Sequence, residues 1–202
     1  MSQNAHSFVA RPANTQAESA SAFFRRARFL TTVAKLADLP PSQAEVAFAG
    51  RSNAGKSSAL NALCDQTRLA FSSKTPGRTW FLNYFDLGDA RHLVDLPGYG
   101  FAKAPGDIKK QWDKLIGPYL ACHPPLAGLI LIMDCRHPLT PLDWQMLDFF
   151  LPTGKPVHIV LSKADKLSRS EQASTLHRVR QTLAQHPGQM TAQLFSSLKK
   201  TG

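Results

Sequence analysis

The sequence predicts an α/β fold, a doubly wound, mostly parallel sheet of six strands with helices on both faces. Two observations lead to this prediction. Short apolar runs of strand length alternate along the chain with longer stretches in which apolar residues recur at helical spacing. The first run also leads through a glycine-rich turn directly into a helix, as the first strand of a parallel sheet commonly does. In such sheets, ligands bind at the carboxyl ends of the strands.

Each element follows from a local pattern. Residues 22–40 mix phenylalanines with basic residues, and we expect a helical extension or a clasp docked on the main domain. Gly88 and Asp89 separate two apolar runs as a hairpin turn does. Pro141 suits a first helical turn, and Ser170 is the expected cap of the last helix. The predicted strands span residues 46–49, 80–87, 90–96, 126–133, 156–161 and 191–195, and the predicted helices start at Lys56 or span 107–121, 141–151 and 170–186.

Length and composition limit the class of protein. The 202 residues suffice for one core, so we expect a single domain over 21–202 behind a disordered tail at 1–20. The net charge of +10 favours a polyanionic partner such as RNA, although a basic surface that is merely soluble remains the alternative. Three widely spaced cysteines predict reduced thiols rather than disulfides or a zinc site. Without a signal-peptide core or an apolar run of membrane-spanning length, we expect a cytoplasmic monomer with no membrane contact.

The glycine-rich turn matches the phosphate-binding loop pattern G-x-x-x-x-G-K-S. Gly50 and Gly55 let the backbone curl so that its N–H groups point at an anion, and the helix behind them adds partial positive charge. Lys56 would reach the terminal phosphates, and the Ser57 hydroxyl would bind Mg²⁺. A chance glycine turn is the alternative, but the strand before it and the helix after it favour the phosphate site.

A second phosphate motif, D-x-x-G, follows the predicted hairpin. Asp95 can hold the metal through its water shell, and the Gly98 N–H can bond a phosphate oxygen that is present only before hydrolysis. Alone, this pattern would predict only a turn. Its place after the phosphate loop and a hairpin favours the phosphate site.

The segment SKAD, residues 162–165, follows the strand at 156–161 and lies where a base would be bound. An aspartate at 165 can accept two hydrogen bonds from guanine, whereas adenine offers no such pair of donors. The Lys163 stem can cover the base while its ammonium braces the phosphate loop. A helix cap at a strand end is the alternative. Backbone N–H groups of FSSL, residues 195–198, are expected to face the guanine oxygen.

The motifs GRSNAGKS, PGRT, DLPG, SKAD and FSS have the order and spacing typical of Ras-like GTPases. DLPGYGFAK, with the preceding SKTPGRT, further resembles the EngB family of bacterial ribosome-biogenesis GTPases, also called YihA or YsxC. The resemblance runs from about Phe29 to the last residue. It implies a GTP- and Mg²⁺-dependent GTPase that assists assembly of the large ribosomal subunit or its precursor through ribosomal RNA, with a link to cell division and septation.

The resemblance also implies roles for individual residues. Lys56, Thr79 and Gly98 would be catalytic, and Thr79 would join Ser57 and Asp95 around Mg²⁺ only in the GTP state. The expected nucleotide-binding residues are Gly50, Arg51, Ser52, Asn53, Ala54, Gly55, Lys56, Ser57, Ser58, Gly77, Arg78, Thr79, Asp95, Leu96, Pro97, Gly98, Ser162, Lys163, Ala164, Asp165, Phe195, Ser196 and Ser197.

Four features of this sequence differ from the commonest pattern of GTPase motifs or add to it. Ser162 stands where Asn or Thr is usual, and its hydroxyl can still brace the loop. Tyr99 replaces the glutamine that orients the attacking water, so we expect slow intrinsic hydrolysis. The chain stops at Gly202, where the fold usually adds a helix, so the C-terminal helix is apparently missing and an apolar face should be exposed. Asn53 either helps to bind K⁺ or is a plain turn residue.

Two other functions remain open at this stage. A small-molecule kinase could use the same phosphate loop, but it would have no need of SKAD. A nucleotide-sensing RNA-binding module with negligible hydrolysis is compatible with Tyr99. Under the favoured interpretation, GTP orders the segments 71–80 and 98–106, and nearby lysines meet ribosomal RNA in one nucleotide state. These lysines are Lys103, Lys109, Lys110 and Lys114.

Overall fold

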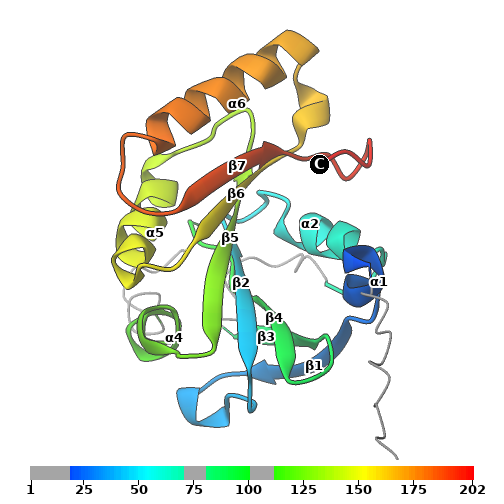
Figure 1. Cartoon of the computed structure of the whole chain (residues 1–202), viewed down its shortest axis with the longest axis vertical. Helices are drawn as coiled ribbons and strands as arrows, with labels where there is room; N and C mark the ends of the chain where they lie inside the picture. Colours follow the sequence, from blue (N-terminus) through cyan, green and yellow to red (C-terminus); the bar gives the residue numbers. More distant parts are fainter. Residues whose placement is uncertain (1–18, 71–80, 101–111) are drawn as a thin grey trace, which may run out of the picture.

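The computed structural model describes residues 19–70, 81–100 and 112–202 (Figure 1). The strands are β1 (Arg28–Val33), β2 (Ala44–Gly50), β3 (Leu82–Asp86), β4 (Arg91–Asp95), β5 (Leu126–Asp134), β6 (Val157–Ser162) and β7 (Met190–Leu194). The α-helices are α1 (Ala20–Arg25), α2 (Lys56–Leu63), α4 (Gly117–Cys122), α5 (Pro141–Phe150) and α6 (Arg169–Leu183). Shorter helical segments are η1 (Leu36–Asp38), the π-helical η2 (Trp112–Ile116), η3 (Leu151–Thr153) and η4 (Ala164–Lys166).

All seven strands form one sheet in the order β1-β3-β4-β2-β5-β6-β7. The five strands from β4 to β7 in this order run parallel, whereas β3 pairs antiparallel with both β4 and β1. Figure 1 shows α1 and α2 on one face, and α4, α5 and α6 on the other. The predicted fold class is therefore confirmed. Because β2, β4 and β6 run in the same direction, their carboxyl ends lie together along one side of the sheet.

The sheet has seven strands rather than the six that the sequence predicted. The additional strand, β1, lies within residues 22–40, where we expected a helical extension. Helical structure there is limited to α1 and the short η1, and α1 is capped by the Ser19 hydroxyl, which accepts a hydrogen bond from Ala22 N–H. The β-branched residues Thr31, Thr32 and Val33 favour an extended chain and pair with β3 at the edge of the sheet. Of the expected tail at 1–20, residues 1–18 lie outside the described residues.

The helices begin close to where their capping residues predict. The α5 helix starts after Thr140, whose hydroxyl accepts from Asp143 N–H while the Asp143 carboxylate accepts from Thr140 N–H. The cap of α6 is Ser168 rather than the expected Ser170, because Ser168 and Glu171 form the same reciprocal pair. The first five residues of the predicted helix at 107–121 lie outside the described residues, and the remainder corresponds to η2 and α4.

Two apolar cores hold the layers together. On one face, Tyr119 of α4, Phe150 of α5 and Val179 of α6 are fully buried against the sheet. On the other face, Leu60 and Cys64 pack against Phe48 and other residues of the sheet. Burial raises the pKa of the Cys64 thiol to about 11, as expected for a reduced core cysteine.

A buried polar cluster around one carboxylate, Glu45, lies near the start of β2, at the opposite end of this strand from Gly50. Glu45 is fully buried, and its Oε2 accepts hydrogen bonds from the hydroxyls of Tyr119 at 2.7 Å and Tyr84 at 3.1 Å. His123 Nε2 lies 3.1 Å from Oε1. Burial and the nearby carboxylate raise the pKa of both tyrosines. The cluster joins β2, β3 and α4 away from the carboxyl ends of the strands.

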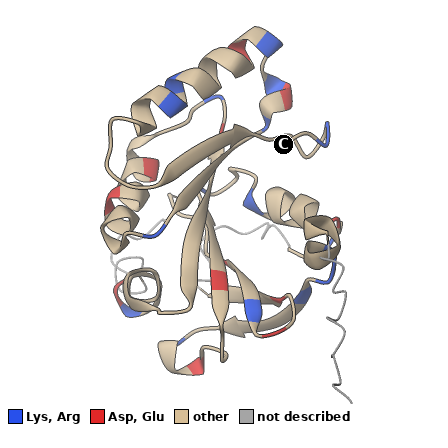
Figure 2. Cartoon of the chain, in the orientation of Figure 1, with Lys and Arg blue, Asp and Glu red and all other residues tan. Residues whose placement is uncertain are grey.

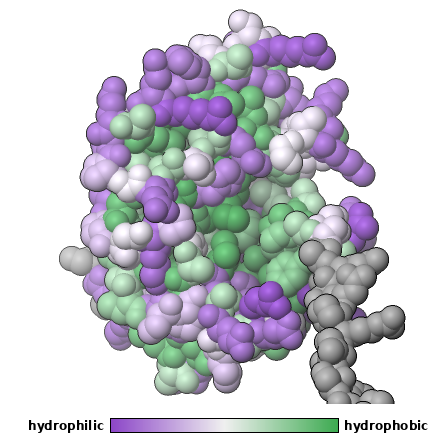
Figure 3. All heavy atoms as spheres, viewed as in Figure 1, coloured by the Kyte–Doolittle hydropathy of each residue, from purple (hydrophilic) through white to green (hydrophobic). Residues whose placement is uncertain are grey.

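The face that carries α1 and α2 also has a groove of about 800 Å³ (Figure 3). Its apolar lining includes Leu63 of α2, Ile132 of β5 and Val160 of β6, together with Phe195 just after β7. Polar side chains, among them Asn61 and Gln193, also line this groove. Within the described ranges, no helix is both long and apolar enough to cross a bilayer.

Candidate nucleotide-binding site

The predicted phosphate loop connects β2 to α2. Gly50 is pressed against β5, since a Cβ there would lie 2.7 Å from the Ile132 carbonyl oxygen. Gly55 has a φ of +101°, which favours glycine, and it precedes the first residue of α2, Lys56. A Cβ on Gly55 would lie 3.4 Å from Ser162 Oγ. Gly50 is therefore required by its close approach to β5, and Gly55 by its backbone angle.

Within the loop, Asn53 adopts the left-handed conformation with φ of 63°. Asparagine tolerates this region better than most residues. The neighbouring Ala54 N–H donates to the Arg51 carbonyl over 3.0 Å, which closes the turn. The local geometry thus gives Asn53 a turn role that needs no bound cation.

The loop lysine lies beside the aspartate of the second phosphate motif. The ammonium of Lys56 forms an ion pair with Asp95 Oδ1, and both side chains are nearly buried. Asp95 ends β4 and pairs in register with Phe48 of the neighbouring β2. The parallel pairing of β2 and β4 thus brings Lys56 and Asp95, which are 39 positions apart in the sequence, into contact.

The residues after Asp95 pack against the phosphate loop. Ser52 N–H donates to the Tyr99 carbonyl at 2.9 Å, and Tyr99 N–H donates to the Gly50 carbonyl at 3.3 Å. A Cβ on Gly98 would lie 3.2 Å from Ser52 Cα. The second phosphate motif and the loop are therefore in direct backbone contact.

The side chain of Tyr99 bonds a residue that the sequence had not identified as part of the site. Its hydroxyl donates to Asp143 Oδ1 over 2.9 Å. Burial and the adjacent carboxylate raise the pKa of Tyr99, so the phenol keeps its proton. The hydroxyl is thus held at the start of α5.

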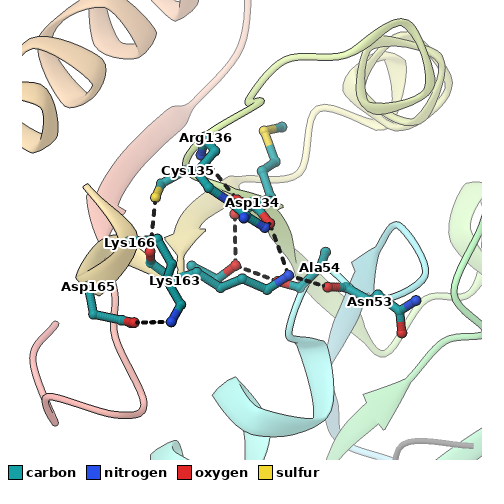
Figure 4. Close-up of polar contacts among 10 residues, drawn as sticks. Asn53, Ala54, Asp134, Cys135, Arg136, Lys163, Asp165 and Lys166 are labelled. Carbon is teal, nitrogen blue, oxygen red and sulfur yellow. Dashed lines mark hydrogen bonds and ion pairs between the residues drawn. The ribbon is translucent and has the colours of Figure 1, made fainter. Parts of the chain in front are cut away.

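The base-side residues brace the phosphate loop (Figure 4). The buried Ser162 hydroxyl bonds the Ala54 carbonyl and lies 3.0 Å from the Met133 carbonyl oxygen. Lys163 Nζ donates to the Asn53 carbonyl at 2.7 Å and to Asp134 Oδ2 at 2.9 Å. Both contacts to the loop agree with the bracing roles expected from the sequence.

Asp134 anchors the bracing lysine and was not among the predicted site residues. Arg136 donates to both carboxylate oxygens, at 2.9 and 2.6 Å. These bonds, followed by those from Lys163, hold the Asp134 pKa well below its usual range. The only sequence signal for this contact was the spacing of Asp134 and Arg136, two positions apart at the end of a buried strand.

Asp165 is held by the last predicted motif. Its Oδ1 accepts a hydrogen bond from the Ser196 hydroxyl at 2.6 Å, and this bond lowers the pKa of the carboxyl. Lys166 Nζ lies 3.7 Å from Oδ2. The side chain of Asp165 is only 9% exposed, and the hydrogen bond from Ser196 favours its ionised form in this largely enclosed position.

The motif at 195–198 differs in one respect from expectation. Phe195 N–H donates to the Leu161 carbonyl at 2.8 Å, and Ser196 N–H donates to the Thr201 carbonyl at 2.9 Å. These two amides are therefore already bonded within the protein. Sequence reasoning missed this because the bond to Thr201 depends on how the chain folds back after β7.

The oxygen ligands proposed for Mg²⁺ are only partly described. Ser57 and Asp95 supply a hydroxyl and a carboxylate, the hard oxygen donors that Mg²⁺ prefers. No group of three or more His, Cys, Asp or Glu side chains able to hold a metal occurs within the described ranges. A magnesium ion that keeps several waters and binds substrate phosphates needs no such group. The predicted residues Gly77, Arg78 and Thr79 lie outside the described residues.

Comparison with known proteins identifies the family. A family model described as "50S ribosome-binding GTPase" matches residues 45–163. A protein of Thiobacillus denitrificans named "Probable GTP-binding protein EngB" is 60% identical over 184 residues, covering 91% of this chain and 89% of that protein. The chain belongs to the EngB family of GTP-binding proteins. A relative of the same name in Aromatoleum aromaticum is 59% identical over 180 residues, covering 89% of this chain and 83% of its own length.

Solved structures agree with the EngB fold. The crystal structure of a probable GTP-binding protein engB matches with a TM-score of 0.59 at 19% identity, covering 77% of this chain and 90% of that one. The structure of Era in complex with MgGDPNP and nucleotides 1506–1542 of 16S ribosomal RNA matches with a TM-score of 0.58 at 23% identity, covering 77% of this chain and 51% of that one. At these identities the two structures support the fold alone.

In this EngB-family chain, the fold places the described parts of the predicted motifs around one edge of the sheet. The phosphate loop lies between the Asp95 motif and the base-side residues Ser162 and Lys163. Asp134 and Asp143 are the additions that only the structure revealed, each fixing a side chain at this edge.

Proposed function

We propose that the protein binds GTP and GDP with Mg²⁺ and hydrolyses GTP slowly, as a switch that assists assembly of the large ribosomal subunit. The observation that carries the proposal is the ionised, nearly buried Asp165, held by Ser196 beside a phosphate loop that Ser162 and Lys163 brace. A buried carboxylate with a fixed orientation suits the two adjacent donors of guanine. An adenine base would leave it unpaired.

The phosphates would rest on the loop at 50–58. Its curled backbone and the start of α2 favour an anion, and Lys56 would exchange Asp95 for phosphate oxygens. The guanine would meet Asp165, with the Lys163 stem across its plane. Because the amides of Phe195 and Ser196 are bonded internally, we assign the guanine oxygen to the amides of residues 197–198.

The magnesium ion would be held by Ser57 and Asp95, with Thr79 joining in the GTP state. When bound, the ion neutralises charge on the phosphates and so makes the terminal group easier to transfer. Slow turnover follows from Tyr99, whose hydroxyl is held by Asp143 instead of orienting a water. Gly98 would donate its N–H to the terminal phosphate. K⁺ would act only as an accessory ion, since Asn53 already has a turn role.

Charge supports an RNA partner. The chain carries a net charge of +10, and Figure 2 shows Lys and Arg on α1, along α6 and near the C-terminal end. Neutralising RNA phosphates with such side chains releases counterions and gives salt-dependent binding. We further propose that the protein acts in the cytoplasm as a monomer on the subunit or its precursor, and that the family link to cell division and septation follows from this role.

Multiple-turnover hydrolysis of GTP, measured with and without large-subunit particles, tests the proposal. We expect a slow rate that particles raise, and GTP binding that a large excess of ATP leaves intact. A protein that binds GTP but never turns it over would instead be a nucleotide-sensing RNA-binding module. Transfer of phosphate to a nucleoside or sugar would indicate a kinase, and equal affinity for ATP and GTP would remove the basis for either guanine-specific function.

A further inference from the structure

Residues Gly98, Tyr99 and Gly100 are held from two sides. On the side of the phosphate loop, the Tyr99 backbone exchanges hydrogen bonds with Ser52 N–H at 2.9 Å and the Gly50 carbonyl at 3.3 Å. Gly98 approaches the loop so closely that a Cβ would lie 3.2 Å from Ser52 Cα. The Ser52 N–H of the phosphate loop therefore already donates a hydrogen bond to a protein carbonyl, that of Tyr99.

On the other side, the first turn of α5 provides the anchor. Tyr99 donates its hydroxyl to Asp143 Oδ1, while Asp143 Oδ2 accepts from Thr140 N–H at 2.9 Å and Thr140 Oγ1 at 2.8 Å. The anchor is rigid because Asp143 is almost fully buried and Phe150 of the same helix lies in the core. A Cβ on Gly100 would lie 2.8 Å from Leu142 Cδ1, so the backbone also touches this turn.

We propose that the Tyr99–Asp143 hydrogen bond gives the site a preference for GDP over GTP, an inference that rests on the proposed guanine-nucleotide function. A terminal phosphate bonded by both the loop and Gly98 N–H has to lie between them. In this structure the two are in contact, so GTP has to move the backbone at 98–99. GDP has no terminal phosphate and leaves that contact in place.

The hydrogen bond resists this movement because its acceptor belongs to a helix fixed in the core. A ligand shifts a conformational equilibrium only by its difference in affinity for the two states. Since GTP requires the shifted backbone and GDP does not, the bond weakens GTP binding selectively. Tyr99 is thus a positioning residue that acts on nucleotide preference through the backbone of the second phosphate motif.

The test is Tyr99→Phe, which keeps the ring and removes the hydroxyl. Dissociation constants are measured for GDP and for a non-hydrolysable GTP analogue, both with Mg²⁺. We expect the analogue to bind the variant about five- to tenfold more tightly than it binds the wild type, as loss of one buried hydrogen bond predicts. We expect the GDP constant to change by less than about twofold on the same reasoning.

Tyr119→Phe is the matched control. It removes a tyrosine hydroxyl from another buried carboxylate, Glu45, at the opposite end of β2, and should leave the ratio of the two constants unchanged. An unchanged ratio in Tyr99→Phe, or an equal change for both nucleotides, would overturn the inference. So would a wild-type protein that binds the analogue as tightly as GDP. A wild-type protein that binds neither guanine nucleotide would instead refute the proposed function itself.

Discussion

Replacing Asp165 with Asn tests the base-reading site directly. The carboxylate is 9% exposed and has one oxygen bonded to Ser196, so its orientation toward a base is restricted. Two hydrogen bonds from guanine to a charged acceptor would each contribute about 1.5–3 kcal/mol. Asn replaces at least one acceptor with a donor, so we expect GDP to bind roughly 100-fold more weakly, or worse.

The same variant should gain affinity for xanthosine diphosphate. Xanthine carries a carbonyl acceptor where guanine has its amino donor, and the new amide N–H₂ can donate to it. The Ser196 hydroxyl can still donate to an amide oxygen, so thermal unfolding should shift by only a few degrees. Binding of both nucleotides is measured by titration calorimetry alongside thermal unfolding.

Asp148→Asn is the control, because Asp148 is an exposed aspartate on α5 and the chemical change is identical. It should bind GDP as the wild type does. If the variant at 165 binds GDP with undiminished affinity while remaining folded, the carboxylate does not read the base. The guanine specificity would then have to come from other residues.

Two further predictions concern the architecture of the site. Gly50→Ala places a Cβ 2.7 Å from the Ile132 carbonyl oxygen, so β2 has to move away from β5. We expect the free energy of unfolding, measured in urea, to fall by about 1–3 kcal/mol. An unchanged midpoint of urea unfolding would contradict the close packing of these two strands. Arg136 and then Lys163 lower the Asp134 pKa below its ordinary 3.8, so the resulting stabilisation is complete above that pH and is lost as pH falls below it. Wild-type protein should therefore lose more stability than Asp134→Asn between about pH 6 and pH 3, and parallel unfolding curves would refute this.

Local patterns in the sequence predicted the parallel core of the fold. The runs at 126–133 and 156–161 are mostly apolar, with only His158 polar, because both faces of the sheet are covered, and each lies within a residue of an observed strand. The strand β1 was missed because its apolar residues do not alternate cleanly. Phe29 and Leu30 are adjacent and both partly exposed at the sheet edge, so the pattern resembled a helix as much as a strand.

Local patterns also singled out the loop at 50–57, Asp95, Ser162 and Lys163, which the structure brings into contact, because each belongs to a short motif with fixed spacing. The Tyr99–Asp143 bond could not be predicted in this way. Its partners are 44 positions apart, and Asp143 has a sufficient local explanation as part of a helix cap. Contacts of this kind are set by how α5 packs on the sheet.

The position of β1 has a practical consequence for shortened forms of the protein. The sequence invites a cut near Pro40 and Pro41, just before the first strand of the nucleotide-binding motif. Such a cut would remove β1 from its pairing with β3. The freed side of β3 would then carry a row of main-chain N–H and C=O groups without partners at the sheet margin. Unprotected margins recruit strands from other molecules, so a fragment trimmed in this way should self-associate even with every nucleotide-binding motif intact.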